Sequence, residues 1–352
     1  MNERRNRTLS IVIKNLEKSY DVPVLKRINL EVPQGQILGV IGKSGTGKST
    51  LLRCLNGLES PSGGTITIDG QPFTGVSDKK RRQIQQKIGN IFQSFNLLSR
   101  LTTLENVMFP LKLLKRDAKE SRLKAIEMLG LVGLKGKENV YPSQLSGGQS
   151  QRVAIARALI SDVSLLLCDE FTSALDPETS LEILELLRDL NKKLGVTIIM
   201  ITHDMAIVRE ICDEVCVLDD GRIVEKNDIA AILLHPQSSA TKSLIRNLIK
   251  KDLPHHLQEQ LVQSPILRSS VLLRLFYSSQ VSEDPIISSL VKKYDVPINI
   301  LVGNLDHIRE TAFGSLIVEI PNEISVIDQI ITELDQRGVS AEILGYLPHK
   351  EE

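Results

Sequence analysis

The sequence predicts an α/β fold built on a mostly parallel sheet, followed by a smaller α+β domain. In the first part, expected helices and strands alternate: helix 149–160, strand 164–168, helix 177–194 and strand 197–201. Strands separated by helices predict a parallel sheet with both faces covered. After Pro265 the composition changes, and the pattern becomes β-α-β-β-α-β, the split ferredoxin-like order.

The expected elements place buried strands early in the chain and a complete small domain at its end. Residues 9–32 alternate like a strand meander, and the unbroken apolar run 37–41 is typical of a central strand buried on both faces. The expected elements of the last domain are strands at 271–277, 298–305, 315–320 and 340–347, and helices at 285–294 and 324–337.

A chain of 352 residues is long enough for two or three domains. We expect a first domain over 1–250, with a helical subdomain at about 94–160. A polar helical linker should follow over 251–265, and the C-terminal domain should cover 266–352.

Charge and hydropathy exclude several classes of protein. Lys plus Arg and Asp plus Glu both number 43, so the net charge is zero, and the basic surplus of a general nucleic-acid binder is missing. We therefore expect no nucleic-acid partner. No apolar run reaches the ~20 residues of a transmembrane helix, and the charged N-terminal residues 1–8 precede no apolar segment, unlike a secretory signal.

The four cysteines show no spacing typical of metal ligands. They are Cys54, Cys168, Cys212 and Cys216. We expect them to be buried thiols in a reducing cytoplasm.

A glycine-rich turn after the strand at 37–41 matches the phosphate-loop pattern G-x-x-x-x-G-K-[ST]. Its glycines let the backbone curl so that N–H groups surround a phosphate, and the following helix adds its positive dipole end. Lys48 is expected to reach the β- and γ-phosphates, and Ser49 to bind Mg²⁺. The expected ATP-binding residues of this segment are Gly42, Lys43, Ser44, Gly45, Thr46, Gly47, Lys48, Ser49 and Thr50.

Two carboxylates close the apolar strand at 164–168. Ligands of open parallel sheets bind beyond the carboxyl ends of the strands, so Asp169 and Glu170 should lie beside the phosphates. Asp169 is expected to hold Mg²⁺, and Glu170 to act as the general base on the attacking water. His203 ends the next strand in the same manner, and we expect it to contact the γ-phosphate.

The segment that separates this chain from other phosphate-loop proteins begins with Leu145, Ser146, Gly147, Gly148 and Gln149. Ser146 can cap a helix whose first turn has free N–H groups. Here the sequence resembles the ATP-binding-cassette ATPases. The resemblance implies a homodimer in which this signature closes over the ATP held by the phosphate loop of the other copy.

Other segments match that family in the expected order. Tyr20 is similar to the aromatic residue that stacks on adenine, and Gln93 to the glutamine that contacts Mg²⁺ and the attacking water. A further segment resembles the D-loop, which couples the two active sites. It consists of Ser173, Ala174, Leu175 and Asp176.

Two residues depart from the family pattern. Phe171 stands where a small residue or proline is usual, and Ser150 where glutamine or lysine is common. Neither replaces a phosphate, metal or water contact, so we expect an active ATPase, with altered packing near the D-loop.

The segment 92–107 is similar to the importer ATPases of bacteria. In that group the helical subdomain receives a short cytoplasmic helix of the permease. Phe95, Leu97 and Leu98 are candidates to line this groove, and they are equally candidates for the core of the subdomain.

The C-terminal domain resembles the ligand-sensing extension of methionine-importer ATPases. Asn299 matches a position implicated there in methionine binding, which inhibits the transporter. Pro297 and Ile298 stand where more polar residues are common, and residues 309–310 where small ones occur. A domain that only dimerises is the alternative.

Taken together, the resemblance implies the ATPase subunit of an importer for D- or L-methionine, peripheral on the cytoplasmic face of the cell membrane. Its expected partners are a second copy of the chain, two permease subunits, an extracytoplasmic binding protein and methionine as an allosteric ligand. ATP and Mg²⁺ are the expected substrate and cofactor.

Three alternatives stay open. One is an importer ATPase for another amino acid or a lipid, with a similar sensor domain. Another is a soluble ABC protein that acts on ribosomes or DNA, which would have two tandem cassettes or a long coiled-coil insertion. The last is a regulatory nucleotide binder without hydrolysis, against which Glu170 and His203 argue.

Overall fold

The computed structural model describes residues 8–234, 236–265, 269–278, 285–308 and 311–348. Contacts divide the chain into two compact units, Met1–Ile229 and Ala230–Glu352. The boundary lies before residue 250, where the sequence placed the end of the first domain. Within the described ranges, no helix has both the length and the apolar character needed to cross a membrane.

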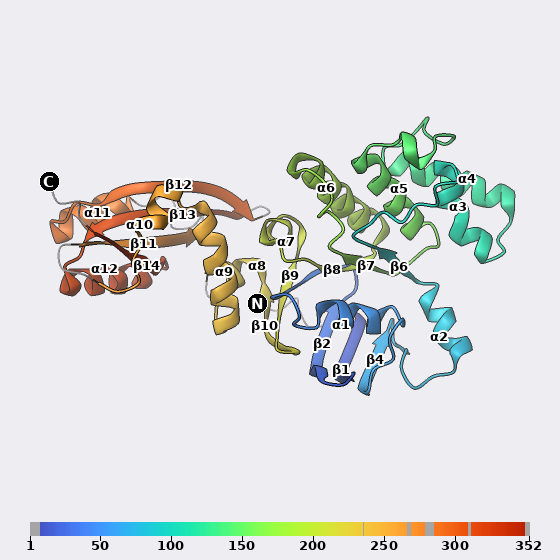
Figure 1. Cartoon of the computed structure of the whole chain (residues 1–352), viewed down its shortest axis with the longest axis horizontal. Coiled ribbons are helices and arrows are strands. Elements are labelled where there is room, and N and C mark those ends of the chain that lie inside the picture. Colours follow the sequence, from blue (N-terminus) through green and yellow to red (C-terminus); the bar gives the residue numbers. More distant parts are fainter. Residues whose placement is uncertain (1–7, 235, 266–268, 279–284, 309–310, 349–352) are drawn as a thin grey trace. The chain divides into compact units, whose positions relative to one another are not determined.

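The first unit contains two sheets and seven α-helices among its described residues (Figure 1). Its strands are β1 (Leu9–Ser19), β2 (Pro23–Pro33), β3 (Ile37–Ile41), β4 (Gly63–Ile68), β5 (Gln71–Pro72), β6 (Ile88–Ile91), β7 (Leu165–Asp169), β8 (Thr197–Ile201), β9 (Glu214–Asp219) and β10 (Arg222–Asp228). Its helices are α1 (Lys48–Leu55), α2 (Asp78–Gln85), α3 (Thr103–Leu113), α4 (Ala118–Leu131), the 3₁₀ helix η2 (Pro142–Gln144), α5 (Gly147–Leu159), α6 (Pro177–Leu194) and α7 (Met205–Ile211).

The larger sheet has the strand order β10-β9-β3-β8-β7-β6. Its five strands from β9 to β6 are parallel, and only β10 runs antiparallel. Every residue of β3 and of β8 is buried, as expected for strands covered on both faces. The predicted α/β fold with a mostly parallel sheet is confirmed.

The smaller sheet is antiparallel, in the order β2-β1-β4-β5. One hydrophobic core joins it to the larger sheet, because the buried residues of β1, β2 and β4 cluster with those of β3, β7 and β8. Leu51 and Leu55 of α1 belong to the same cluster. The helix that begins at the glycine-rich loop is therefore fixed by packing along its length.

Helices α3, α4 and α5 fill the region expected to be a helical subdomain. Each begins with a side chain that caps its first turn. Thr102 forms a capping box with Glu105, and Asp117 accepts hydrogen bonds from the backbone N–H groups of Lys119 and Glu120 at 2.9 Å. Ser146 caps α5.

The four cysteines are free and buried, as the sequence predicted. Burial raises the pKa of the Cys54 thiol to about 11 and that of Cys216 to about 12. Because the thiolate is the metal ligand and nucleophile, neither residue is suited to such chemistry.

The second unit has a four-stranded antiparallel sheet in the order β12-β13-β11-β14. The predicted β-α-β-β-α-β order is confirmed. The elements are α8 (Ile229–Leu234), which starts one residue before the unit boundary, α9 (Ser239–Asp252), α10 (His255–Gln260), β11 (Ser269–Ser278), α11 (Ile286–Tyr294), β12 (Asn299–Ile308), β13 (Thr311–Pro321), α12 (Ile324–Gln336) and β14 (Ser340–Pro348).

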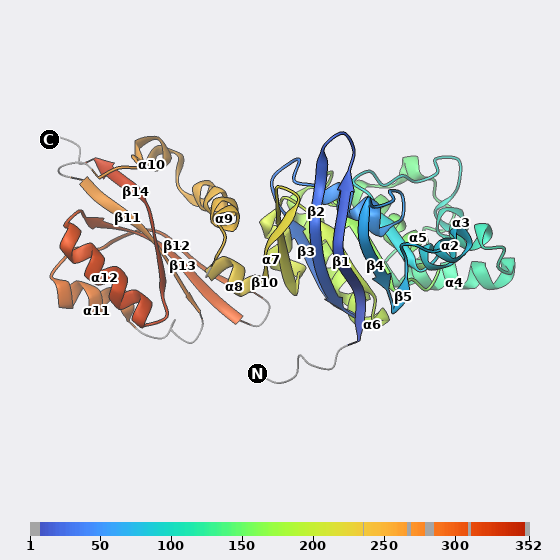
Figure 2. The ribbon, with the colours of Figure 1, turned by 90° about the horizontal axis from the view of Figure 1, so that it is seen from below.

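Helices α11 and α12 pack on one face of this sheet (Figure 2). Val271, Leu273 and Leu275 of β11 meet Leu290 of α11 and Ile330 of α12 in a single core cluster. Successive side chains of a strand point to opposite faces, so the residues between these three lie on the other face.

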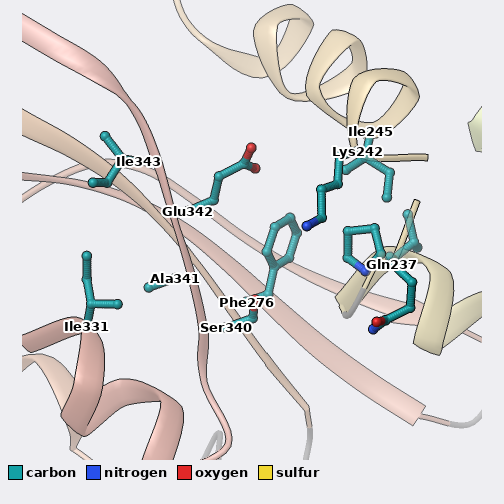
Figure 3. Close-up of a pocket in the computed structure, with 11 residues that line it drawn as sticks. Gln237, Lys242, Ile245, Phe276, Ile331, Ser340, Ala341, Glu342 and Ile343 are labelled. Atoms are coloured by element: carbon teal, nitrogen blue, oxygen red, sulfur yellow. The ribbon is translucent and has the colours of Figure 1, made fainter. Parts of the chain in front are cut away.

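That other face is also buried, because segments before β11 lie against it. Leu272 is fully buried and Phe276 is 6% exposed. Phe276 lines a cavity of about 620 Å³ together with Ile245 of α9 and Glu342 of β14 (Figure 3). The cavity is a hollow between α9 and the last strand of the sheet.

The segment 251–265, expected to be a linker, is helical in part and packed. Leu253 is buried at 3% exposure, α10 lies against β14, and Val262 exchanges backbone hydrogen bonds with Tyr346 at 2.9 and 2.8 Å. The sequence identified the helical character of this region but not its packing, because its polar composition does not reveal the few residues that are buried.

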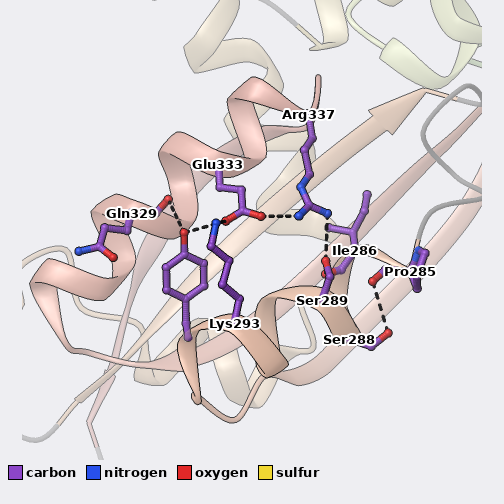
Figure 4. Close-up of polar contacts among 9 residues, drawn as sticks. Pro285, Ile286, Ser288, Ser289, Lys293, Gln329, Glu333 and Arg337 are labelled. Atoms are coloured by element: carbon purple, nitrogen blue, oxygen red, sulfur yellow. Dashed lines mark hydrogen bonds and ion pairs between the residues drawn. The ribbon is translucent and has the colours of Figure 1, made fainter.

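A buried carboxylate joins α11 and α12 (Figure 4). Glu333 accepts hydrogen bonds from the Lys293 amine at 2.6 Å and the Tyr294 hydroxyl at 2.7 Å, and it also pairs with Arg337. Arg337 in turn donates to the Ser289 hydroxyl at 3.0 Å. The contacts from Lys293, then Tyr294, hold the pKa of Glu333 at about 2.

Glu333→Gln should lower the melting temperature of the protein at pH 7, because Lys293 and Arg337 lose their shared anion. The ordinary pKa of a Glu side chain is 4.5, and the folded value is about 2. The stabilisation is therefore complete above pH 4.5 and is lost as the pH falls towards 2. Thermal melts of wild type and variant should converge over this range.

Asp335→Asn, on the exposed side of the same helix, is the matched control. It should melt like wild type at pH 7 and throughout the acidic range. Equal melting of Glu333→Gln and wild type at pH 7 would contradict the role given to this carboxylate.

Candidate active site

The glycine-rich loop connects β3 to α1 in a conformation that depends on glycine at two positions. Gly42 has φ 156° and Gly47 has φ 103°, both in the region that side chains disfavour. A Cβ atom on Gly42 would lie 2.2 Å from the Leu218 carbonyl oxygen, and one on Gly47 would lie 2.9 Å from Leu25. The loop can therefore curl tightly against β2 and β9 only with these glycines.

Lys48 closes the loop from inside. Its Nζ donates hydrogen bonds to the carbonyl oxygens of Gly42 at 2.7 Å and Lys43 at 2.8 Å. The Thr46 hydroxyl donates to the same Lys43 oxygen at 2.9 Å. Burial lowers the pKa of Lys48, while the nearby Glu170 and Asp169 carboxylates oppose that shift. The amine is thus held at the centre of the loop by two backbone carbonyls.

The rest of the loop presents exposed groups beside this amine. Lys43, Ser44, Gly45 and Ser49 are exposed, and Thr50 is half-buried. Backbone N–H groups of such a curled loop, with the first turn of α1, form an anion site.

Asp169 and Glu170 stand at the carboxyl end of β7, at the same sheet edge as the loop. Strand β7 pairs in parallel with β8, and β8 with β3, so their ends lie side by side. Asp169 is half-buried, and burial raises its pKa, as does the adjacent Glu170 carboxylate. The two acids therefore concentrate negative charge next to Lys48.

Glu170 is held in an unusual backbone conformation. Its φ is 42°, a left-handed value that only a minority of non-glycine residues adopt. Its N–H donates to the Ile201 carbonyl at 3.0 Å, and its Oε1 lies 3.0 Å from Nδ1 of His203. The sequence predicted both residues for the site but not their contact, because no spacing along the chain reveals a pairing across neighbouring strands.

Gln93 follows β6 by two residues, and β6 pairs in parallel with β7. The side chain is exposed. Its place in the sheet brings it to the edge where Asp169 lies. Tyr20, after β1, is 51% exposed, and its ring lies 4.7 Å from the Lys18 amine. An exposed aromatic face of this kind is suited to stacking on a base.

The signature segment begins α5 on a different part of the unit. The Ser146 hydroxyl accepts a hydrogen bond from the Gln149 N–H, and the Gln149 side chain accepts one from the Ser146 N–H, both at 3.2 Å. A Cβ on Gly148 would lie 2.6 Å from Cγ2 of Thr179, so α5 and α6 approach closely there. Within the described part of the chain, no hydrogen bond joins this segment to the glycine-rich loop.

The D-loop lies between Glu170 and the signature segment. The Ser173 N–H donates to the Glu170 carbonyl at 3.1 Å, and Leu175 lies beside Gly147. Asp176 caps α6 by accepting from the Thr179 N–H at 2.9 Å, and this contact lowers the pKa of Asp176. The D-loop thus contacts both Glu170 and the signature segment within one chain. The sequence resemblance implied only that this loop couples two active sites.

The two departures from the family pattern are packing positions. Phe171 is 2% exposed and Ser150 is 6% exposed. The Ser150 N–H donates to the Ser146 carbonyl at 2.9 Å, within the first turn of α5. Phe171 stands two residues before Ser173, the first residue of the D-loop, and is among the largest fully buried side chains.

The donor set at this edge fits Mg²⁺. Mg²⁺ prefers oxygen ligands and binds through one or two carboxylates together with phosphate oxygens. Asp169 supplies a half-buried carboxylate and Ser49 an exposed hydroxyl at this edge of the sheet. Among the described residues, no group of three or more His, Cys, Asp or Glu side chains is placed to hold a metal ion.

Comparisons with known proteins match both parts of the chain. A family model described as ABC transporter matches residues 25–173, and one described as NIL domain matches residues 271–343. The methionine import ATP-binding proteins MetN of Desulfitobacterium hafniense and Coxiella burnetii are 45% and 43% identical over 95% and 96% of the chain, covering 99% and 97% of those proteins.

The chain belongs to the ABC transporter ATPases. It combines an ABC ATPase core with a C-terminal NIL domain. Solved ABC structures agree with the fold of the core. The ABC protein cbiO1 of Clostridium perfringens is 31% identical with a TM-score of 0.61, covering 72% of this chain and 99% of its own. A dimeric ATP-binding cassette bound to ADP and Pi is 37% identical with a TM-score of 0.56, covering 62% and 98%.

Lys48→Met should weaken ATP binding to the ABC core by at least about tenfold, because a charged hydrogen-bond donor contributes about 1.5–3 kcal/mol. The measurement is equilibrium binding of a fluorescent ATP analogue to the purified chain. Lys79→Met, an exposed lysine of α2, is the control and should bind like wild type. Unchanged affinity of the Lys48 variant would remove this amine from the site.

Proposed function

We propose that this chain is the ATP-hydrolysing subunit that energises methionine import across the cell membrane. The observation that carries the ATPase part is the contact of Glu170 with His203 at the sheet edge where Lys48 closes the phosphate loop. Relatives named methionine import ATP-binding protein, 41–45% identical over about 95% of the chain, support the substrate.

In the proposed reaction, ATP and water give ADP and phosphate. Lys48 binds β- and γ-phosphate oxygens in place of the loop carbonyls that it now contacts. Glu170 accepts the proton of the attacking water, and His203 orients Glu170 through the 3.0 Å contact and lies near the γ-phosphate. When bound by Ser49 and Asp169, with Gln93 beside them, Mg²⁺ would neutralise charge on the phosphates.

Two copies of the chain complete each nucleotide site in this proposal. Ser146 caps α5 and Gly148 lies in its first turn, where N–H groups are free to bind a ligand. In the single chain, no hydrogen bond of the described residues links this segment to the phosphate loop. A second copy can place them against the γ-phosphate bound by the first. A related cassette has been solved as a dimer bound to ADP and Pi, which supports this arrangement.

The remaining partners follow from the proposed role. Two permease subunits would form the pathway, an extracytoplasmic protein would deliver methionine, and the chain would be peripheral on the cytoplasmic face. In the helical subdomain, Phe95 and Leu97 are half-buried and Leu98 is 37% exposed. Partly exposed apolar side chains suit a groove for a permease helix.

The C-terminal domain is the proposed regulatory part. A ligand that favours the state with separated ATPase cores lowers the population of the closed, hydrolysing dimer by its differential affinity. Asn299, the position expected to contact methionine, stands on the edge strand β12, and its side-chain amide donates to Glu319 at 3.3 Å. Residues 309–310 lie outside the described residues.

Glu170→Gln should lower the ATP hydrolysis rate by about 10²- to 10⁴-fold, because the amide cannot accept a proton from water. The same variant should accumulate as an ATP-bound dimer in size-exclusion chromatography. Glu185→Gln, an exposed residue of α6, serves as control and should hydrolyse at the wild-type rate. Wild-type turnover by Glu170→Gln would show that another group is the base.

Methionine that is supplied on the side of the binding protein should stimulate ATP hydrolysis when the chain is reconstituted in liposomes with its permease and its binding protein. We expect uptake of labelled methionine to require ATP and to fail with Glu170→Gln. Uptake of other amino acids, measured in the same vesicles, is the control. Hydrolysis coupled only to a different amino acid or to a lipid would reject methionine and keep the ATPase assignment.

A further inference from the structure

Lys18, the penultimate residue of β1, lies beside Tyr20, the aromatic side chain suited to stacking on a base. The Lys18 side chain is only 12% exposed. Its amine lies over the Tyr20 ring at 4.7 Å from the centre, within the ~6 Å range of a cation–π contact. The amine thus covers one face of the ring. Because Tyr20 is about half-exposed, the opposite face is the one on which a base can stack.

The Lys18 amine is held in place by the segment that follows α1. It lies 2.9 Å from Oε2 of Glu59 and donates a hydrogen bond to the Ser60 carbonyl at 2.9 Å. The hydrogen bond with Glu59 raises the pKa of Lys18, so the amine stays charged. Glu59 is itself anchored, because its N–H donates to the Arg53 carbonyl of α1 at 2.9 Å.

The Glu59 carboxylate interacts with the phenol of Tyr20 as well as with the amine. Its contact with Lys18 is the main cause that holds the pKa of Glu59 below the ordinary value, and the Tyr20 hydroxyl adds to this effect. The three side chains therefore form one cluster. The nearby pair of Arg27 and Glu17 is different, with 77% and 46% exposed side chains 3.4 Å apart. Exposed pairs of that kind fix little.

This cluster connects the base-stacking side chain to the helix that begins at the phosphate loop. Glu59 follows the last residue of α1 by four positions. Backbone contacts join the same two segments: the Ser62 N–H donates to the Glu17 carbonyl at 2.7 Å, and the Ser19 N–H donates to the Ser62 hydroxyl at 3.0 Å. The distance between the ring and the phosphate loop is thus set by contacts on both sides of the cluster.

We propose that the ion pair of Lys18 and Glu59 positions the Tyr20 ring for stacking on the base of ATP. The pair acts through the ring, so Lys18 and Glu59 are positioning residues. The inference rests on the proposed function, in which the chain binds and hydrolyses ATP. Stacking on the base contributes equally before and during phosphoryl transfer. Loss of the pair should therefore raise KM and leave kcat unchanged.

The test compares ATP with inorganic tripolyphosphate, which has no base, by calorimetric titration of the full purified chain. Lys18→Met and Glu59→Gln should each weaken ATP binding by about threefold to tenfold, as loss of a cation–π contact does. Tripolyphosphate binding should stay at the wild-type value. Steady-state ATP hydrolysis should show KM raised by the same factor at unchanged kcat.

Matched controls remove the same charges from exposed sites nearby. Lys14→Met on β1 and Glu31→Gln on β2 should bind both ligands like wild type. Lys18→Arg should restore ATP binding, because a guanidinium also pairs with a carboxylate and lies over aromatic rings. Circular dichroism and thermal melting verify that every variant is folded.

A double-mutant cycle shows whether the amine acts through the ring. In the Tyr20→Leu background, Lys18→Met should cause no further loss of ATP affinity, because the ring that it positions is gone. An equal loss in both backgrounds would overturn the proposal and show that the amine contacts the nucleotide directly.

Two other results would also overturn the proposal. One is unchanged ATP affinity in folded Lys18→Met and Glu59→Gln. The other is an equal loss of ATP and tripolyphosphate binding, which indicates a general disturbance of the phosphate loop. Failure of the proposed function is distinct from both. A wild-type chain that binds ATP more tightly than tripolyphosphate but does not hydrolyse it would reject the ATPase assignment, and the binding comparison among variants would still test the ion pair.

Discussion

Parallel pairing of β6, β7, β8 and β3 is the constraint on which the active site depends. Because these strands run in one direction and are buried on both faces, their carboxyl ends meet at one edge. The phosphate loop, Asp169 and Glu170, His203 and Gln93 follow those ends. Residues separated by more than 150 positions, such as Lys48 and His203, thus reach one small region of the fold.

Within that region, Lys48 and Glu170 are positioned by contacts with the backbone. Lys48 donates to two loop carbonyls, and Glu170 is anchored through the Ile201 and Ser173 backbone. The Ser173 contact connects Glu170 to the D-loop, and Leu175 of the D-loop lies beside Gly147 at the start of α5.

Local patterns allowed much of this to be predicted from the sequence. The apolar run 37–41, the glycine-rich loop and the carboxylates after β7 are contiguous signals, and α6 and β8 have the expected bounds. Contacts between residues that are distant in the sequence could not be predicted from such local patterns. Glu170 and His203 stand at the ends of two different strands, so their contact depends on how the strands pair. The Ser173 N–H donates to the carbonyl of Glu170, whose left-handed backbone conformation no sequence pattern predicts. Similarly, the polar composition of 239–265 concealed Ile245 and Leu253, which are buried.

The burial of both faces of the C-terminal sheet decides where this domain can be cut from the chain. A fragment that starts at residue 266 keeps α11 and α12 but loses α9, α10 and Val262, so Leu272 and Phe276 become solvent-exposed. Such a fragment would present an apolar sheet surface to other molecules and tend to aggregate. An autonomous recombinant domain should instead start near residue 230, where the contacts along the chain divide.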